Sequence, residues 1–310
     1  FGSIIVVNGD MTTGGLAACS LLAGRAMAPL QKALGVWTRF QTFILARERL
    51  EKLFAMPREA PPGMPKLPPA RGALELRDVN FRYGEKMPWI IRDTSISIAE
   101  GECVAILGGN GGGKTTLLAL MQGAIKPTSG NVLVDGADVA QFDPPSVRDQ
   151  IAYLPQSGVL FQGTILQNIT MFRPEFDDIA VETAGLLGLD EVVATMAMGF
   201  DTPVGDGAYD SLPRGIKQRI AIARALISNP RIVLFDEANT AVDAAGDNFL
   251  RVWLERAKGK RTLVLVTHRP SLVKLADNVY DLEGGRLTRR VPEGEKVAPP
   301  QALLPQGGTA

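Results

Sequence analysis

The chain has few cysteines, a single histidine and no net charge. Its only cysteines, Cys19 and Cys103, lie far apart in regions of different composition, which argues against a disulfide framework or a zinc cluster. Lysine and arginine number 33, and aspartate and glutamate also number 33, so the formal net charge is zero. The chain therefore lacks the basic excess that favours nucleic-acid binding, and we expect no nucleic-acid partner.

The start of the chain also lacks the charged region of a signal peptide. Phe1, rather than methionine, opens the chain in the middle of an apolar run, "FGSIIVV", which predicts that the sequence is the C-terminal piece of a longer protein. Hydrophobic residues make up 45% of the 310 residues, which is enough to bury a sizeable core.

One long apolar segment lies near the N-terminus. Residues 14–34 would span roughly 31 Å as a helix, enough to cross the hydrocarbon core of a bilayer. Arg25 near its middle costs about 2.5–3.5 kcal/mol to insert, so we expect it to face a bundle interior or an aqueous path. The alternative is a soluble helical hairpin. Asp10 precedes the segment and a basic group follows it, which indicates a cytoplasmic exit. The basic residues are Lys32, Arg39, Arg47, Arg49 and Lys52.

Composition divides the rest of the chain. A mixed apolar and charged pattern predicts that a helix continues to about residue 54, so residues 1–56 form one region. Six prolines between residues 57 and 72 predict an extended linker. Residues 73–290 alternate short β-rich runs with helical stretches, which indicates an α/β domain with a mainly parallel sheet. Residues 291–310 are rich in proline and glycine, and we expect them to be disordered.

A glycine-rich stretch inside the α/β domain predicts a phosphate-binding loop. "GGNGGGKT" follows the apolar run "CVAIL" and precedes a helical pattern, which is the context that such a loop requires. Glycines let backbone N–H groups approach phosphates. Lys114 is expected to reach the β and γ phosphates, and Thr115 to bind Mg²⁺. The expected nucleotide-binding residues here are Gly108, Gly109, Asn110, Gly111, Gly112, Gly113, Lys114, Thr115 and Thr116.

Acidic residues and the histidine follow two other apolar strands. "IVLFDE" ends in Asp236, which suits a Mg²⁺ shell, and Glu237, which suits a base for an attacking water. "LVTH" ends in His268, at the strand end where α/β sheets bind their ligands, so contact with a γ-phosphate is expected. Taken alone, two acidic residues at a strand end would more often be solvated, and a lone histidine would more often be structural.

In this order, the motifs of residues 74–290 closely resemble those of the ATP-binding cassette (ABC) family. Besides the segments above, the chain has Tyr83 in "FRYG", Gln156 in "YLPQ", a helix at residues 211–226 and Asp243 in "ANTAVD". The resemblance implies a P-loop ATPase with a catalytic α/β lobe, an antiparallel β subdomain, and a helical lobe at about residues 158–225 that meets a membrane domain. It also implies roles for two residues: Tyr83 would stack on adenine, and Gln156 would couple the Mg²⁺ and water site to the helical lobe.

The N-terminal region resembles the last membrane helix of exporter half-transporters. "TTGGLAACSLLAGRAMAPL" is similar to that helix in type I secretion ATPases, which export proteins from Gram-negative bacteria. This resemblance implies an inner-membrane exporter with its ATP-binding domain in the cytoplasm, a periplasmic adaptor, an outer-membrane channel and a polypeptide substrate. Lipid-exporting half-transporters share the architecture and remain the competing substrate class.

The chain departs from the family at the signature motif. Where the family has Leu-Ser-Gly-Gly-Gln, this chain has Leu212, Pro213, Arg214, Gly215 and Ile216. In the family dimer each signature closes over the ATP of the other cassette, and Pro213 has neither a hydroxyl nor an N–H to offer. Arg214 supplies a cation that could pair with phosphate. We therefore expect a heterodimer with a half-transporter that has an intact signature. A regulatory half with little hydrolysis and a soluble DNA-repair or translation cassette are the alternatives.

Overall fold

The computed structural model describes residues 2–9, 11–56, 58–205, 212–238 and 244–290. Asp243 and the tail predicted to be disordered lie outside the described residues. The chain divides into two compact units, residues 1–59 and 60–310, and each is described here by itself.

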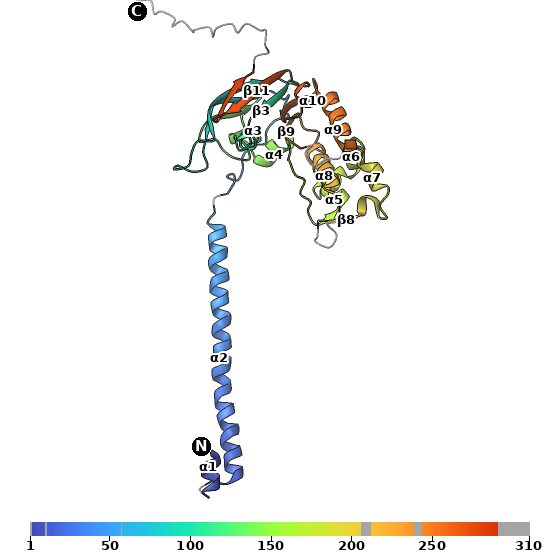
Figure 1. The fold of residues 1–310 in the computed structure, drawn as a ribbon. Helices are drawn as coiled ribbons and strands as arrows, with labels where there is room; N and C mark the ends of the chain where they lie inside the picture. Colours follow the sequence, from blue (N-terminus) through green and yellow to red (C-terminus); the bar gives the residue numbers. More distant parts are fainter. Residues whose placement is uncertain (1, 10, 57, 206–211, 239–243, 291–310) are drawn as a thin grey trace, which may run out of the picture. The chain divides into compact units, whose positions relative to one another are not determined.

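Two helices form the first unit. α1 (Gly2–Val7) is short, and α2 (Thr13–Phe54) has 42 residues (Figure 1). The Thr12 side chain caps α2 by accepting a hydrogen bond from the backbone N–H of Gly15 at 3.1 Å. No residue of α2 is buried, and the helix includes Pro29 in its interior.

Within the described residues, no helix combines the length and the apolar character that a membrane crossing needs. Residues 14–34, predicted from their length to cross a bilayer, do not meet this requirement. Arg25, Gln31 and Lys32 lower the mean hydropathy of the segment, although its length would suffice.

Two sheets form the centre of the second unit. An antiparallel sheet has the order β2-β1-β4-β5, and a larger sheet has the order β12-β11-β3-β10-β9-β6. The first contains β1 (Leu74–Phe81), β2 (Ile91–Ile98), β4 (Ser129–Val134) and β5 (Ala137–Asp138). The second contains β3 (Cys103–Leu107), β6 (Ile151–Leu154), β9 (Ile232–Asp236), β10 (Thr262–Val266), β11 (Asn278–Glu283) and β12 (Arg286–Arg289). All its pairs are parallel except β11 with β12.

The central strands of the larger sheet are parallel and apolar on both faces. Every residue of β9 and of β10 is buried. Such continuous apolar runs are typical of strands that are covered on both sides by other elements. The carboxyl ends of β3, β9 and β10 therefore meet at one edge of the sheet, where the predicted phosphate loop, Asp236 and His268 follow their strands.

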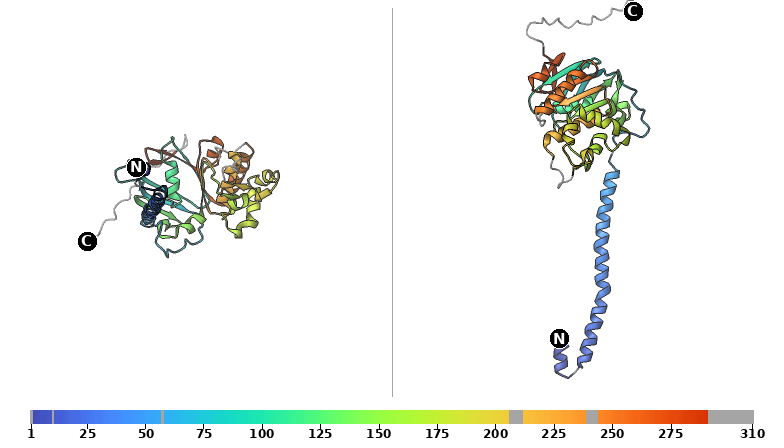
Figure 2. Two further views of the ribbon diagram at one scale, coloured as in Figure 1. Left: turned by 90° about the horizontal axis from the view of Figure 1, so that it is seen from below. Right: turned by 90° about the vertical axis from the view of Figure 1, so that its right-hand side faces the viewer.

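Helices cover the sheets and form a separate helical lobe. Near the sheets are α3 (Lys114–Met121), α4 (Pro144–Gln150), α9 (Ala244–Ala257), α10 (Pro270–Val273) and the short helix η1 (Val139–Gln141). The helical lobe contains α5 (Ile165–Thr170), α6 (Asp177–Gly185), α7 (Leu189–Val193) and α8 (Arg214–Leu226), with the short elements η2 (Pro174–Phe176), η3 (Gly199–Asp201), β7 (Gly163–Thr164) and β8 (Pro203–Val204). In Figures 1 and 2, α5–α8 gather at the side of the unit away from the antiparallel sheet.

Two hydrophobic cores correspond to the two lobes. One lies between the antiparallel sheet, α3 and one face of the larger sheet, and includes Leu76, Leu118 and Val264. The other joins the opposite face to the helical lobe, and includes Phe235, Ile169 and Ile222. These cores confirm the predicted fold class, an α/β P-loop cassette with an antiparallel β subdomain and a helical lobe.

Candidate nucleotide-binding site

The loop between β3 and α3 has glycine where other residues would collide. A Cβ at Gly108 would lie 2.6 Å from the carbonyl oxygen of Leu282, and Gly108 has a φ of +154°. Gly113 precedes α3 with a φ of +93°, in the left-handed region that glycine adopts readily. The loop therefore brings its backbone and the N-terminus of α3 close to a ligand without side chains in between, which suits an anion.

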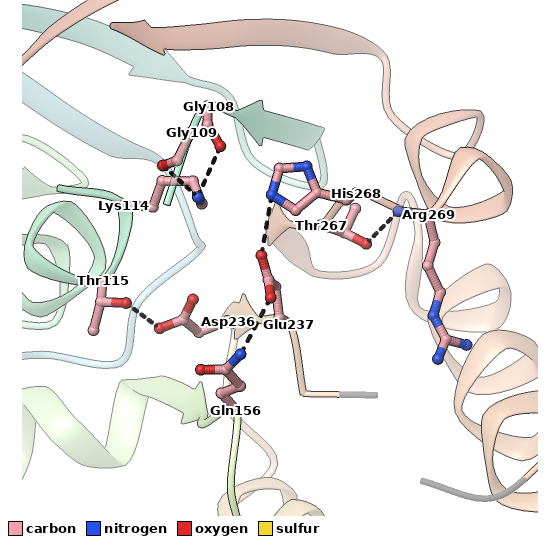
Figure 3. A network of polar contacts seen from close by, with 10 residues as sticks. All are labelled: Gly108, Gly109, Lys114, Thr115, Gln156, Asp236, Glu237, Thr267, His268 and Arg269. Carbon is pink, nitrogen blue, oxygen red and sulfur yellow. Dashed lines mark hydrogen bonds and ion pairs between the residues drawn. The ribbon is translucent and has the colours of Figure 1, made fainter. Parts of the chain in front are cut away.

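Lys114 is buried within this loop. Its exposed fraction is 9%, and its ammonium Nζ donates to the carbonyl oxygens of Gly108 at 2.9 Å and of Gly109 at 3.0 Å (Figure 3). The loop carbonyls thus hold the positive charge inside the curve of the loop. Phosphate oxygens cradled by the loop would be stronger acceptors for the same ammonium, because they carry negative charge and the carbonyl oxygens do not.

Thr115 and Asp236 contact each other at the pocket. The Thr115 hydroxyl donates to Asp236 Oδ2 at 2.8 Å, and Asp236 is only 5% exposed. The pair joins the first turn of α3 to the end of β9. A hydroxyl and a carboxylate are hard oxygen donors of the kind Mg²⁺ prefers, so these residues fit the ion that accompanies ATP.

Glu237 lies between Gln156 and His268. Its Oε2 accepts from Gln156 Nε2 at 3.3 Å, and its Oε1 is 3.3 Å from His268 Nε2 (Figure 3). The backbone of Glu237 has a φ of +46°, and its N–H donates to the carbonyl oxygen of Val266 on β10. Three segments distant in the sequence thus converge on one carboxylate at the sheet edge. A carboxylate fixed in this way could orient a water molecule and accept its proton.

A pocket of about 470 Å³ brings most of the predicted residues together. Its lining includes Asn110, Gly111, Gly112, Gly113, Lys114, Thr115, Thr116, Gln156, Asp236 and Glu237. Gly108 and Gly109 accept hydrogen bonds from Lys114, which lines the pocket. His268 contacts Glu237, which also lines it. Tyr83 is 62% exposed outside the lining, and its hydroxyl lies 3.2 Å from Thr116 Oγ1. Its stacking on adenine stays a prediction.

Sequence reasoning missed two residues at this site. Ile90, just before β2, lines the pocket, and a Cβ at Gly113 would come within 3.0 Å of its side chain. Tyr153, near the end of β6, donates its hydroxyl to Asp236 Oδ2 at 2.9 Å. Ile90 had no signal in the sequence. Tyr153 had a weak one, since it is the first residue of the "YLPQ" motif that supplied Gln156.

The unusual signature residues begin α8, away from this pocket. Pro213 is the N-cap of α8, within the range 211–226 where a helix was expected, and it makes no side-chain capping bond. Arg214 is exposed, and Leu212 packs against the core of the helical lobe. None of the three lines the pocket that contains Lys114. A role for them in an ATP site therefore requires a second cassette.

Helix α8 is attached directly to the segment that carries Gln156. The amide Nε2 of Gln218, which is fully buried, donates to the carbonyl oxygen of Pro155. Arg224 Nη1 donates to the carbonyl oxygen of Val159 at 2.9 Å. A Cβ at Gly158, which lies between Pro155 and Val159 in the sequence, would be 2.5 Å from the carbonyl oxygen of Lys217 on α8. The backbones of the two segments are thus in contact, and there is no room for a side chain at Gly158.

Gly158→Ala is expected to lower the free energy of unfolding by about 1–3 kcal/mol, the usual cost of overpacking. The added methyl group would push α8 away from the Gln156 segment, because the obstructing atoms belong to the backbone. Urea unfolding of the nucleotide-free protein measures the effect. Gly84→Ala is the matched control, since its Cβ would meet only the Met87 side chain at an ordinary 3.6 Å. Equal stability of the two variants would contradict the close contact.

A glycine loop between a buried parallel strand and a helix, with a strand-end aspartate beside its threonine, defines a P-loop nucleotide-binding domain. Residues 91–240 match the family model described as ABC transporter. The chain carries an ABC transporter ATPase cassette, and it is related to toxin and hemolysin translocation proteins.

Its relatives have longer chains. The chain is 35% identical to the toxin RTX-I translocation ATP-binding protein of Actinobacillus pleuropneumoniae over 303 residues, which are 97% of this chain and 43% of the relative. It is 34% identical to the alpha-hemolysin translocation ATP-binding protein HlyB of Escherichia coli, with the same coverage. Among solved structures it resembles a bacterial Atm1-family ABC exporter with ATP bound, with a TM-score of 0.71 and 30% identity over 90% of this chain and 49% of that one. The chain thus spans less than half the length of these relatives.

Proposed function

We propose that this chain belongs to the ATP-hydrolysing subunit of a membrane exporter of the type I secretion class, which moves a protein or peptide out of the cell. The observation that carries the proposal is the position of Glu237, held at the pocket beside Asp236 by contacts with Gln156 and His268. This is a hydrolytic arrangement, because it supplies a cation for phosphates and a fixed carboxylate for water at the same pocket.

The residues of the pocket divide the chemistry between them. Lys114 would exchange its loop carbonyls for the β and γ phosphates of ATP. Glu237 would orient the attacking water and accept its proton, while His268 and Gln156 keep the carboxylate in place. Mg²⁺ bound by Thr115 and Asp236, with Gln156 nearby, would neutralise charge on the phosphates.

The polypeptide substrate is inferred from the relatives, whose names specify toxin, hemolysin and leukotoxin translocation or export. By analogy we propose an inner-membrane location for the full-length protein, a cytoplasmic cassette, a periplasmic adaptor and an outer-membrane channel. Introducing Glu237→Gln in the native host tests this: one or more polypeptides should disappear from the culture medium. Unchanged secreted protein together with altered membrane lipid would favour a lipid exporter instead.

We propose further that the partner is a different half-transporter with an intact signature. Pro213 has no N–H and no hydroxyl, so it cannot make the contacts that the family's serine makes, and Arg214 places a long cationic side chain where the family has a glycine. This chain's own pocket retains Lys114, Asp236 and Glu237. A mixed dimer would then have one fast site, made from this pocket and the partner's signature, and one site that holds ATP with little turnover.

Pro213→Ser combined with Arg214→Gly is expected to raise the ATPase rate of this half-transporter alone toward the rate of the mixed complex. The change restores a hydroxyl and an N–H at the start of α8. Purified protein, with and without the candidate partner, provides the four rates needed. If the unmodified protein alone already hydrolyses ATP as fast as the mixed complex, and the double substitution changes nothing, the asymmetric-site proposal is wrong.

A further inference from the structure

Tyr153 contacts the Asp236 carboxylate from outside the phosphate loop. β6 pairs with β9 in parallel, with Tyr153 opposite Leu234, so its side chain reaches along β9 to the acid at the strand end. The Tyr153 hydroxyl donates to Asp236 Oδ2 at 2.9 Å. Its ring packs against the core beneath the antiparallel sheet, which fixes the direction of the hydroxyl.

Two hydroxyls thus share one carboxylate oxygen. Thr115, on α3, donates to Asp236 Oδ2 at 2.8 Å, and Tyr153, on β6, donates to the same atom. The two donors differ in what else they face. Thr115 lines the pocket and is the proposed metal ligand, whereas Tyr153 is not part of the lining. A metal ion that takes the Thr115 oxygen would leave the hydroxyl of Tyr153 as the fixed partner of Oδ2.

The Tyr153 hydroxyl is the donor of this contact, because an ionised carboxylate can only accept a hydrogen bond. A neutral donor to a carboxylate leaves its charge available for a cation and restricts its rotation.

We propose that Tyr153 is a positioning residue that orients the Asp236 carboxylate for the Mg²⁺ ion accompanying ATP. This inference rests on the proposed nucleotide function of the pocket. Hydrogen-bond partners of metal-binding carboxylates commonly change metal affinity by 10- to 100-fold when removed. Tyr153 acts through Asp236 alone, because its contact with the pocket goes through that one oxygen.

Tyr153→Phe distinguishes the role of the hydroxyl from that of the ring. Phenylalanine keeps the packing against the core, so the variant removes one hydrogen bond and leaves the shape unchanged. ATP affinity in EDTA should stay within about twofold of the wild-type value, because the Tyr153 hydroxyl reaches the pocket through Asp236 and not through the other residues that line it. The Mg²⁺ concentration that half-saturates the ATP complex should rise about tenfold. Calorimetric titration of the intact protein, first with ATP in EDTA and then with MgCl₂, gives both values.

Tyr280→Phe is the matched control. Tyr280 lies on β11 and packs against the same core, but β3 and β10 separate its strand from β9. This variant should match the wild-type protein in both titrations. The melting temperatures of the two variants show whether either substitution disturbs the fold.

Each possible result bears on a different claim. An unchanged Mg²⁺ titration for Tyr153→Phe overturns the inference, and so does an equal loss of ATP affinity in EDTA and in Mg²⁺, which would indicate a purely structural hydroxyl. If the wild-type protein binds no ATP, or if Mg²⁺ has no effect on the complex, the proposed nucleotide function itself fails. A tenfold shift confined to the Mg²⁺ titration supports the positioning role.

Discussion

Glu237→Gln is expected to slow ATP hydrolysis by the assembled transporter at least about a hundredfold and to leave ATP binding nearly intact. The amide keeps the shape of the side chain and can still contact Gln156, but it cannot accept a proton from water at neutral pH. Phosphate contacts come from the loop and Lys114, which the substitution does not touch. Phosphate release at saturating ATP and equilibrium nucleotide binding measure the two effects separately.

Glu255→Gln is the control for this substitution. Glu255 forms an exposed pair with Arg251 on α9 at 2.7 Å, and neither residue lines the pocket. Exposed pairs of this kind contribute little to stability, so hydrolysis should be unaffected. Unchanged turnover in Glu237→Gln would remove Glu237 from the mechanism and would leave the residue with a structural role only.

Lys114→Ala should instead weaken ATP binding itself, by about 10- to 100-fold, the range for a hydrogen bond to a charged group. The ammonium is buried in the loop, where two carbonyl oxygens hold it, so the substitution removes a positive charge from inside the phosphate loop. Equilibrium binding of ATP is the measurement. Lys126→Ala, which changes an exposed lysine after the end of α3, provides the comparison. ATP affinity equal to that of the control would contradict the assignment of Lys114.

The parts of the fold that depend on local sequence were predictable. β9 and β10 are unbroken apolar runs, and buried parallel strands require such runs. The phosphate loop was also predictable from local sequence, because glycine adopts the positive φ angles of this loop more readily than other residues. Once the strands were placed in parallel, the convergence of Asp236 and His268 at one edge followed from the topology.

Contacts between distant segments were not predictable. Tyr153 meets Asp236 only because β6 pairs with β9 in a particular register, and Gly158 contacts α8 only because the helical lobe packs there. The register of β6 against β9 and the packing of α8 against Gly158 depend on both partners, so neither can be derived from one segment of sequence. Residues 14–34 show a different difficulty, since their length and the charges on either side favoured a membrane crossing that the apolar character of the helix does not support. Asp243 lies outside the described residues, so its place at the site stays a prediction.

The backbone conformation of Glu237 lowers the stability of the fold, whereas its side chain is proposed to serve ATP hydrolysis. Its φ of +46° is a conformation that costs a non-glycine residue roughly 1–3 kcal/mol, and glycine would adopt it freely. Heat selection on a library randomised at this codon would therefore enrich glycine, while selection for secretion would retain the acid. The two selections would therefore favour different residues at position 237. A glycine recovered from the heat selection would mark a protein that is more stable but lacks the carboxylate proposed for hydrolysis.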